Sequence, residues 1–413
     1  MRWRSTEWYK RLDFLCHKDP QPIQAGDLVK VPGRYWHPKK QRDVDAEQER
    51  SKQMFERILV PLDGSRRAEQ ALPIAARLAR ASGGTIVLLR VVSLPNALVS
   101  YVALEPLPLE VDMEAACEEA RNYLDGITTG SSLAGIHTQT EVILGQAAAS
   151  ILSAVSAHHL DLIVLCSHGY TGMKRWVMGS VAEKVAHHSP VPVLVLREGR
   201  PLRVDPRLDG ESPWRVLVPL DGSRRAQVAI APAALVSAAL SAPARGALHL
   251  TRVVVQPDPD EISHRKREAI IHKAKEYLDT TAEQIREGLI ASPVANLQLA
   301  LTWSVTIDED SASGIIRVAE GGEDGEGAGA SGRGLLIAMT TRGANGLPRW
   351  VMGSITGRVL HATRLPLLLV PPPDLLGKAY QNGDRAASAA RAGQADEKDV
   401  GEPGGGDTRK SAT

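Results

Sequence analysis

Two short strings of residues each occur twice in this chain, in the same order. LVPLDGSRRA stands at 59–68 and again at 217–226, and RWVMGS stands at 175–180 and again at 349–354. Similarity at a long fixed interval indicates a duplicated structural unit. A chain of 413 residues is also long enough for two domains of roughly 100–200 residues each. We therefore predict two domains that are built alike.

Each copy alternates short apolar runs with longer helical patterns. The expected strands are RILVPL, TIVLLRVV, HTQTEVIL, DLIVLCS and PVPVLVLR in the first copy, and VLVPL, ALHLTRVVV, LQLALTWS, GLLIAMTT and LPLLLVPP in the second. Strands that alternate with helices indicate a parallel sheet covered on both faces, and strands buried on both faces are apolar throughout. We predict an α/β protein of two tandem doubly wound, Rossmann-like domains, each a five-stranded parallel sheet flanked by helices.

The copies differ in length, and the ends of the chain belong to neither. The glycine-rich stretch at 321–334 accounts for much of the extra length of the second copy and is predicted to be a flexible insertion. The predicted divisions are an N-terminal extension at 1–53 that is poorly ordered or not native, a first domain at 54–200, a linker at 201–211, a second domain at 212–373 and a disordered tail at 374–413.

Composition excludes several classes of function. The formal net charge is +1 and aromatic residues make up 4% of the chain, which argues against a nucleic-acid surface. The three cysteines form no CxxC pair, so neither a disulfide framework nor a zinc site is expected. No stretch approaches the 18 or so apolar residues of a membrane span. We expect a protein of the reducing cytoplasm with no membrane or nucleic-acid partner.

The repeated strings stand where a doubly wound sheet binds its ligands, at the carboxyl ends of strands beside the switch in strand order. LVPLDGSRRA covers the end of the first strand, and RWVMGS leads into the helix after the fourth. Asp63 can accept hydrogen bonds from a base amine or a ribose hydroxyl, an apolar slot between Val91 and Leu165 can hold a flat base, and Gly179-Ser180 at a helix start suits a phosphate. The residues favour a nucleotide site. The alternatives are that Asp63 and Ser65 only form a turn and cap, and that Gly179-Ser180 is only a helix start.

A spaced glycine motif connects these features. The first copy reads Cys166-Ser-His-Gly169, nine residues, then Gly179-Ser180, and the second reads Thr340-Thr-Arg-Gly343, nine residues, then Gly353-Ser354. Together with the PLDGS turn, this resembles the universal stress protein family in its tandem form. Nucleotide-binding members of that family carry Gly, two residues, Gly, nine residues, Gly, then Ser or Thr. Both copies depart from this pattern at the first glycine.

The resemblance implies binding of ATP or another adenine nucleotide, with or without Mg²⁺, in a regulatory stress-response role. It implies that Asp63 and the Val91 backbone hold adenine, that Pro61 and the Cys166 position lie along the ribose, and that the remaining residues surround the phosphates. The residues implied are Pro61, Asp63, Val91, Cys166, Gly169, Gly179, Ser180 and Val181 in the first copy, and Pro219, Asp221, Val253, Thr340, Gly343, Gly353, Ser354 and Ile355 in the second. Since the family's last strand pairs across a two-fold axis, the last strands of the two copies are expected to pair as an internal pseudo-dimer, with a homodimer as a further option.

Two other functions stay open, a scaffold or interaction protein of the same fold that binds no nucleotide and a slow ATPase. No nucleophile has a paired base and orienting acid at recognisable spacing, so no catalytic residue and at most weak hydrolysis are expected. The GxGxxG string at 327–332 leads into a strand instead of a helix and is not a dinucleotide motif. We expect the first copy to bind better, because Asp308, Glu309 and Asp310 stand near the second site, where the first copy has Gly145.

Overall fold

The computed structural model of the chain describes residues 29–31, 34–36, 54–93, 113–167, 178–197, 214–256, 264–321, 336–342 and 352–372. The chain divides into two compact units, residues 1–50 and 51–413. The first unit contains an antiparallel hairpin of β1 (Val29–Val31) and β2 (Arg34–Trp36). The sequence analysis did not predict this hairpin, although the Pro-Gly pair at 32–33 is a turn signal.

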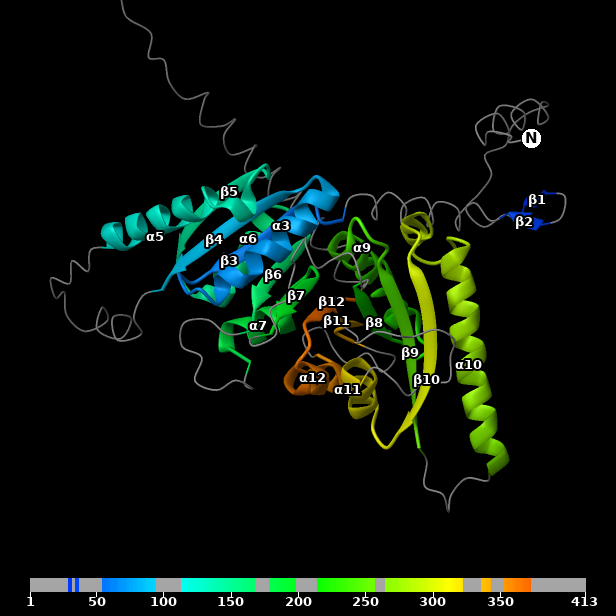
Figure 1. Cartoon of the computed structure of the whole chain (residues 1–413). Coiled ribbons are helices and arrows are strands. Elements are labelled where there is room, and N and C mark those ends of the chain that lie inside the picture. The colour runs from blue at the N-terminus through cyan, green and yellow to red at the C-terminus, as the bar shows by residue number, and fades with distance from the viewer. Residues whose placement is uncertain are drawn as a thin grey trace, which may run out of the picture. The chain divides into compact units, whose positions relative to one another are not determined.

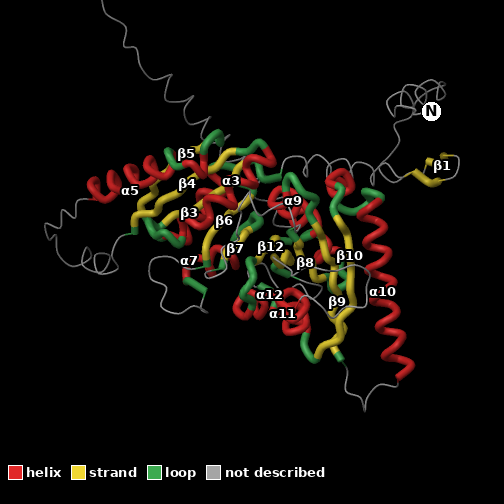
Figure 2. Tube along the Cα trace, viewed as in Figure 1, coloured by secondary structure: helices red, strands yellow, loops and turns green. Residues whose placement is uncertain are grey.

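The second unit begins with a five-stranded half in which strands and helices alternate (Figures 1 and 2). Its elements are β3 (Arg57–Leu62), η1 (Ala68–Gln70), α3 (Ala71–Ser82), β4 (Thr85–Val92), α5 (Met113–Thr128), η2 (Ser131–Leu133), β5 (Thr138–Leu144), α6 (Ala147–Ala157), β6 (Leu162–Cys166), α7 (Ser180–His188) and β7 (Val193–Leu196).

The second half of this unit repeats the alternation. Its elements are β8 (Arg215–Pro219), α8 (Arg224–Gln227), α9 (Ile230–Ser241), β9 (Ala247–Val255), α10 (His264–Arg286), η3 (Ser292–Leu297), β10 (Ala300–Asp308), α11 (Ser311–Gly321), β11 (Leu336–Thr340), α12 (Ser354–Ala362) and β12 (Leu367–Val370). Each strand predicted from an apolar run is present, so the predicted α/β class is confirmed.

The strands of both halves form one sheet, in the order β10-β9-β8-β11-β12-β7-β6-β3-β4-β5. Pairing is parallel within each half, and the order of the first half is the mirror of the order of the second. The halves meet where β12 pairs antiparallel with β7, with Leu368 opposite Leu194. The pairing predicted between the two last strands is therefore present, and it converts the two predicted sheets into one sheet of ten strands.

The core lies on both faces of this sheet, because alternate strand residues point to opposite sides. Ile58 and Val60 belong to the cluster under α3, α5, α9 and α10, whereas Leu59 belongs to the cluster under α6, α7, α11 and α12. Both clusters include residues of both halves, and most of the strand residues in them are fully buried. At about 1.5–3 kcal/mol for each large apolar side chain buried, this core holds the carboxyl ends of the strands in fixed positions.

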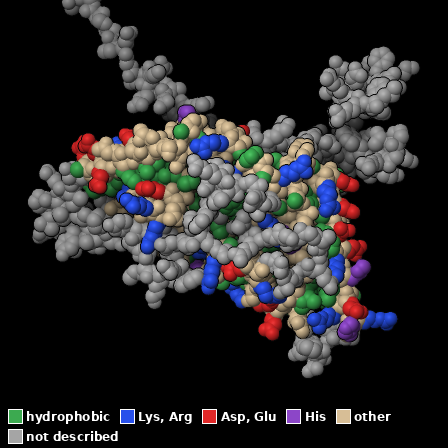
Figure 3. All heavy atoms as spheres, viewed as in Figure 1, with side chains coloured by type: hydrophobic (Ala, Val, Ile, Leu, Met, Phe, Trp, Pro, Cys, Tyr) green, Lys and Arg blue, Asp and Glu red, His purple; other side chains and the backbone are tan. Residues whose placement is uncertain are grey.

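The outer surface carries mixed charge. On the face seen in Figure 3, Lys and Arg side chains are interspersed with Asp and Glu over the described elements. No helix in the described part of the chain is both long and apolar enough to cross a bilayer.

Candidate functional site

In each half the first strand lies between the second and the fourth, so the switch in strand order falls beside the repeated strings. Leu59 of β3 pairs with Ile163 of β6, and continuing this register places Asp63 level with Ser167. Leu217 of β8 pairs with Ile337 of β11, which places Asp221 level with Thr341 in the same way. The predicted adjacency of the first and fourth strands is present in both halves.

The loop that follows the fourth strand is closed at its base by one backbone hydrogen bond. The Gly179 N–H donates to the Ser167 carbonyl oxygen at 2.7 Å, and the Gly353 N–H donates to the Thr341 carbonyl oxygen at 2.8 Å. The chain thus leaves the sheet and returns to the same point to start α7 or α12. In neither helix does the N-cap glycine provide a side-chain cap, so the first-turn N–H groups and the positive end of the helix dipole are placed beside the strand end.

The Asp-Gly-Ser turn stands at the end of the neighbouring first strand. Asp63 Oδ1 accepts from the Ser65 N–H at 3.0 Å and from the Ser65 hydroxyl at 2.6 Å, and Ser65 Oγ accepts from the Ala68 N–H at 3.2 Å. In the second half Asp221 accepts from the Ser223 N–H at 2.8 Å, and Ser223 caps α8. The turn-and-cap role that the sequence left open is therefore present, and it accounts for one of the two carboxylate oxygens.

The two side chains that replace the first motif glycine do not share a sheet face with Val91 and Leu165 or with Val253. Cys166 Sγ lies 3.9 Å from the Ala68 carbonyl oxygen, at the start of the first helix, and Cys166 packs against the α3-side core. Val91 and Leu165 pack on the opposite face of the sheet. Thr340 is buried, and its hydroxyl donates to the Arg342 carbonyl oxygen at 2.9 Å. Neither side chain therefore lies between Val91 and Leu165 or between their counterparts.

In the second half, helix α11 packs closely on the valine that matches Val91. A Cβ at Gly314 of α11 would lie 2.7 Å from Val253 Cγ1, so the helix backbone packs directly on the valine that matches Val91. The first half has Ser150 at the corresponding helix position, since Ser150 N–H and Gly314 N–H each bond to the N-cap carbonyl of their helix. The backbone of α11 at Gly314 therefore leaves no room for a side chain beside Val253.

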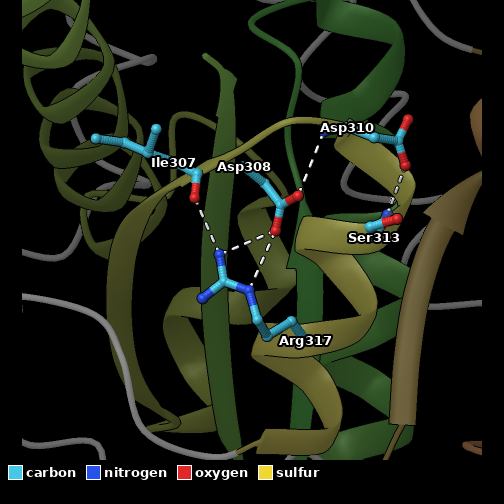
Figure 4. A network of polar contacts seen from close by, with 5 residues as sticks. All are labelled: Ile307, Asp308, Asp310, Ser313 and Arg317. Carbon is cyan, nitrogen blue, oxygen red and sulfur yellow. Dashed lines mark hydrogen bonds and ion pairs between the residues drawn. The ribbon is translucent and has the colours of Figure 1, made fainter.

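The acids near the second site are held in ion pairs. Arg317 donates to Asp308 Oδ2 through Nε at 3.1 Å and through Nη2 at 3.0 Å, and Nη2 also bonds the Ile307 carbonyl oxygen (Figure 4). Arg358 of α12 forms a two-pronged pair with Asp310, with N–O distances of 2.5 and 2.8 Å.

These contacts correct the expectation that Asp308 and Asp310 would repel a polyphosphate. The hydrogen bonds from Arg317 lower the pKa of Asp308. The backbone N–H of Ser313, followed by Arg358, lowers the pKa of Asp310. Both carboxylates are ionised, but the charge of each is neutralised by a neighbouring guanidinium. Of the three acids, only Glu309 could still repel a polyphosphate.

The other predicted residues that the structure describes lie at strand ends and helix starts beside the switch in strand order. Pro61 lies one residue before the end of β3, and Pro219 is the last residue of β8. Ser180 and Ser354 begin α7 and α12, and the side chains next to them, Val181 and Ile355, are about equally exposed at 38% and 39%. Gly169 and Gly343, with most of both loops, lie outside the described residues. Within the described ranges, no group of three or more His, Cys, Asp or Glu side chains could hold a metal ion.

The sequence analysis missed one feature that both halves share. Arg90 and Arg252 lie against the Asp-Gly turns, each stacked on a tyrosine, Tyr123 or Tyr277. The signal was available, because RVV stands at 90–92 and 252–254 and YLD stands at 123–125 and 277–279. These strings are too short to stand out without the fold that brings them together.

Residues 54–197 match the universal stress protein family. This part of the chain is a universal stress protein domain. The universal stress protein YxiE of Bacillus subtilis is 28% identical over 148 residues, which are 35% of this chain and all of the relative. The universal stress protein MJ0577 of Methanocaldococcus jannaschii is 27% identical over 155 residues, with 35% of this chain and 96% of the relative covered.

Among solved structures, a functionally unknown protein from Pseudomonas aeruginosa PAO1 resembles 82% of this chain and 99% of its own, with a TM-score of 0.52 and 15% identity. At that identity the likeness concerns the fold alone. It extends over both halves, whereas the family match ends with the first.

Proposed function

We propose that the first half binds an adenine nucleotide, with ATP the first candidate, and that the chain acts as a nucleotide-responsive regulator in a stress response. One observation carries the proposal. The Asp63 turn and the start of α7 meet at Ser167, because Asp63 is level with it in the strand register and Gly179 bonds to its carbonyl oxygen. A hydrogen-bond acceptor for a base or sugar and a helix start for phosphates thus stand at one switch point.

Each element of this crevice would have a distinct task. The N–H groups of Gly179 and the first turn of α7, with the Ser180 hydroxyl, would donate to phosphate oxygens. Val91 and Leu165, on the same face of the sheet, would contact the flat base. The base or ribose would meet the Asp63 carboxylate, whose Oδ1 is fixed by Ser65.

Mg²⁺ would enter with the phosphates. The described residues offer no acidic cluster that could hold a metal ion, and Mg²⁺ commonly binds through substrate phosphates and waters. We therefore expect ATP to bind more weakly when a chelator removes divalent cations. Equal affinity with and without chelator would contradict this role.

We propose that the second half is the weaker site. Gly314 brings α11 onto Val253, and Asp310 engages Arg358 on the helix that would receive the phosphates. The corresponding positions in the first half are Gln146 and Lys184, which do not form such a pair of opposite charges.

The deciding experiment is equilibrium binding of labelled ATP to the full chain, with Asp63→Asn and Asp221→Asn as matched variants. Asparagine keeps one oxygen for the serine N–H of the turn, so the turn is preserved while the negative charge is lost. We expect one strong site in the wild type, its loss in Asp63→Asn and its retention in Asp221→Asn. The reverse pattern would contradict the assignment.

The same samples test the two alternatives. Binding of no nucleotide by the wild type would favour an interaction protein of the same fold, a reading that the non-glycine residues Cys166 and Thr340 support. Steady release of ADP over many turnovers would favour a slow ATPase. Intact ATP recovered from the complex supports the regulatory proposal.

A further inference from the structure

An arginine supports the Asp-Gly turn in the first half. Gly64 has a φ of +83°, and a Cβ there would lie 3.2 Å from both terminal nitrogens of Arg90. Arg90 Nη1 donates to the Leu62 carbonyl oxygen at 3.5 Å, and Cζ lies 5.7 Å from the centre of the Tyr123 ring. The Tyr123 hydroxyl donates to Glu69 Oε1 at 3.0 Å. The guanidinium is thus held between a tyrosine and the turn that carries Asp63.

The second half contains the same arrangement. Gly222 has a φ of +92°, and a Cβ there would lie 3.2 and 3.3 Å from the terminal nitrogens of Arg252. Cζ of Arg252 lies 5.1 Å from the centre of the Tyr277 ring. Gln227 Nε2 donates to the Tyr277 hydroxyl at 3.2 Å.

The arginine, the tyrosine and the turn glycine are arranged alike in the two halves, whereas the contacts around each tyrosine differ. The polar partner of the tyrosine differs between the halves: Glu69 accepts from the Tyr123 hydroxyl, whereas Gln227 donates to the Tyr277 hydroxyl. The tyrosines come from helices of 16 and 23 residues. The arginine, tyrosine and glycine of each turn thus keep the same arrangement, although the tyrosine's partner and the length of its helix differ.

The physical role follows from the geometry. A planar guanidinium stacked on an aromatic ring loses freedom of rotation, and the stacking is itself favourable. The guanidinium of Arg90 occupies the space that a side chain at Gly64 would need. Glycine and arginine together therefore fix the path of the turn. Burial, followed by the bond to Glu69, raises the pKa of Tyr123, and the hydroxyl stays a donor. The turn in its place orients the carboxylate of Asp63.

We propose that Arg90 and Arg252 are positioning residues that set the orientation of Asp63 and Asp221, and thereby the choice of base in each site. This inference rests on the proposed function. An aspartate held as an acceptor favours a base that presents an amine, as adenine does, over one that presents a carbonyl oxygen at that place, as guanine does. A turn free to move would discriminate less between the two.

The test compares ATP and GTP affinity in the full chain. Arg90→Ala is expected to lower the ratio of ATP to GTP affinity about tenfold, which corresponds to about 1.4 kcal/mol. The Ser65 N–H, which bonds to Asp63, is expected to exchange faster with solvent in the same variant. Arg80→Ala, which removes an exposed arginine of α3 bonded to Ser132 and Ala134 carbonyl oxygens, is the matched control and should leave the ratio unchanged.

A second pair of variants separates positioning from a general loss of structure. In an Asp63→Asn background, where the strong site is expected to be lost, Arg90→Ala should weaken any residual binding of ATP and GTP no further, because its effect passes through the carboxylate. Tyr123→Phe keeps the ring under Arg90 and should keep most of the selectivity. ATP and GTP weakened equally by Arg90→Ala, or an unchanged ratio with an unchanged Ser65 exchange rate, would overturn this inference alone. Wild-type protein that binds neither nucleotide would overturn the proposed function and this inference with it.

Discussion

Two buried groups should give the protein opposing responses to acid. His249 is 2% exposed, and its ring nitrogens bond the hydroxyls of Thr302 and Ser304 at 2.8 Å each. Burial lowers the pKa of His249 to about 3. Asp161 is 7% exposed and accepts from the backbone N–H groups of Glu56 and Arg57. Burial raises the pKa of Asp161 to about 7, although those two hydrogen bonds oppose the rise.

The signs of the two effects are opposite. Unfolded histidine gains a proton below its ordinary pKa of 6.5, so the stability linked to His249 is present above that pH and is lost as the pH falls toward 3. By pH 5 the loss is about 2 kcal/mol. The stability linked to Asp161 is full below 3.8 and is lost as the pH rises through 7. When the pH falls from 8 to 5, the titration of Asp161 therefore raises the free energy of unfolding by about 2.5 kcal/mol. This gain nearly cancels the loss linked to His249.

Single substitutions should expose each term. His249→Val introduces the residue found at the matching position of the first half, Val87, and removes the histidine titration. Relative to wild type, its free energy of unfolding should rise by about 2 kcal/mol more on going from pH 8 to pH 5. Asp161→Asn should shift the same difference by about 2.5 kcal/mol in the opposite direction.

Urea unfolding at pH 5, 6, 7 and 8 measures both effects, since the slope against pH is compared and not the absolute stability. The comparison is unaffected if a substitution also destabilises the protein at every pH. A His249→Val profile parallel to that of the wild type would refute the assignment of a depressed pKa to this ring. An Asp161→Asn profile parallel to wild type would show that Asp161 stays ionised throughout, held by its two backbone donors.

Four further substitutions test backbone packing, a buried guanidinium and an ion pair. Gly84→Ala places a Cβ 2.5 Å from the Phe55 carbonyl oxygen and should lower the free energy of unfolding, as obtained from a thermal melt, by about 1–3 kcal/mol or more. Gly126→Ala meets open space in a helix and should raise the same quantity by about 0.5–1 kcal/mol. Arg197→Met removes a buried guanidinium bonded to the Leu360 carbonyl oxygen. Because the buried charge is removed as well, the free energy of unfolding should fall by only about 1 kcal/mol. A fall several times larger in urea unfolding would contradict this. Asp310→Asn should leave Tm nearly unchanged, with any difference shrinking as salt is added.

Much of the fold was readable from the sequence because its determinants are local. Apolar runs of strand length, separated by helical patterns, define the ten strands of the large sheet, and the duplicated strings identify the equivalent turns. The order of strands and the antiparallel pairing of β7 with β12 follow once the family resemblance is accepted. The hairpin of β1 and β2 was missed because strands of three residues carry too little periodicity to stand out.

The site was harder to predict because its details depend on contacts between distant residues. Asp310 is neutralised by Arg358, 48 positions along the chain, and no local pattern links them. The direction of the Cys166 side chain depends on which face of β6 it occupies, which is defined only when β6 pairs with β3. The strand β9 was read as apolar, yet His249 is buried within it, because Thr302 and Ser304 on the neighbouring strand satisfy both ring nitrogens.

The repeated decapeptide can now be divided by what the fold requires. Gly64 has a positive φ, Ser65 caps the following turn, and Ala68 is buried. These structural roles are enough to explain why the same three residues stand in both halves. Arg66 and its counterpart Arg224 are exposed, and an exposed arginine contributes little to stability. Burial therefore does not explain why this arginine is retained in both copies.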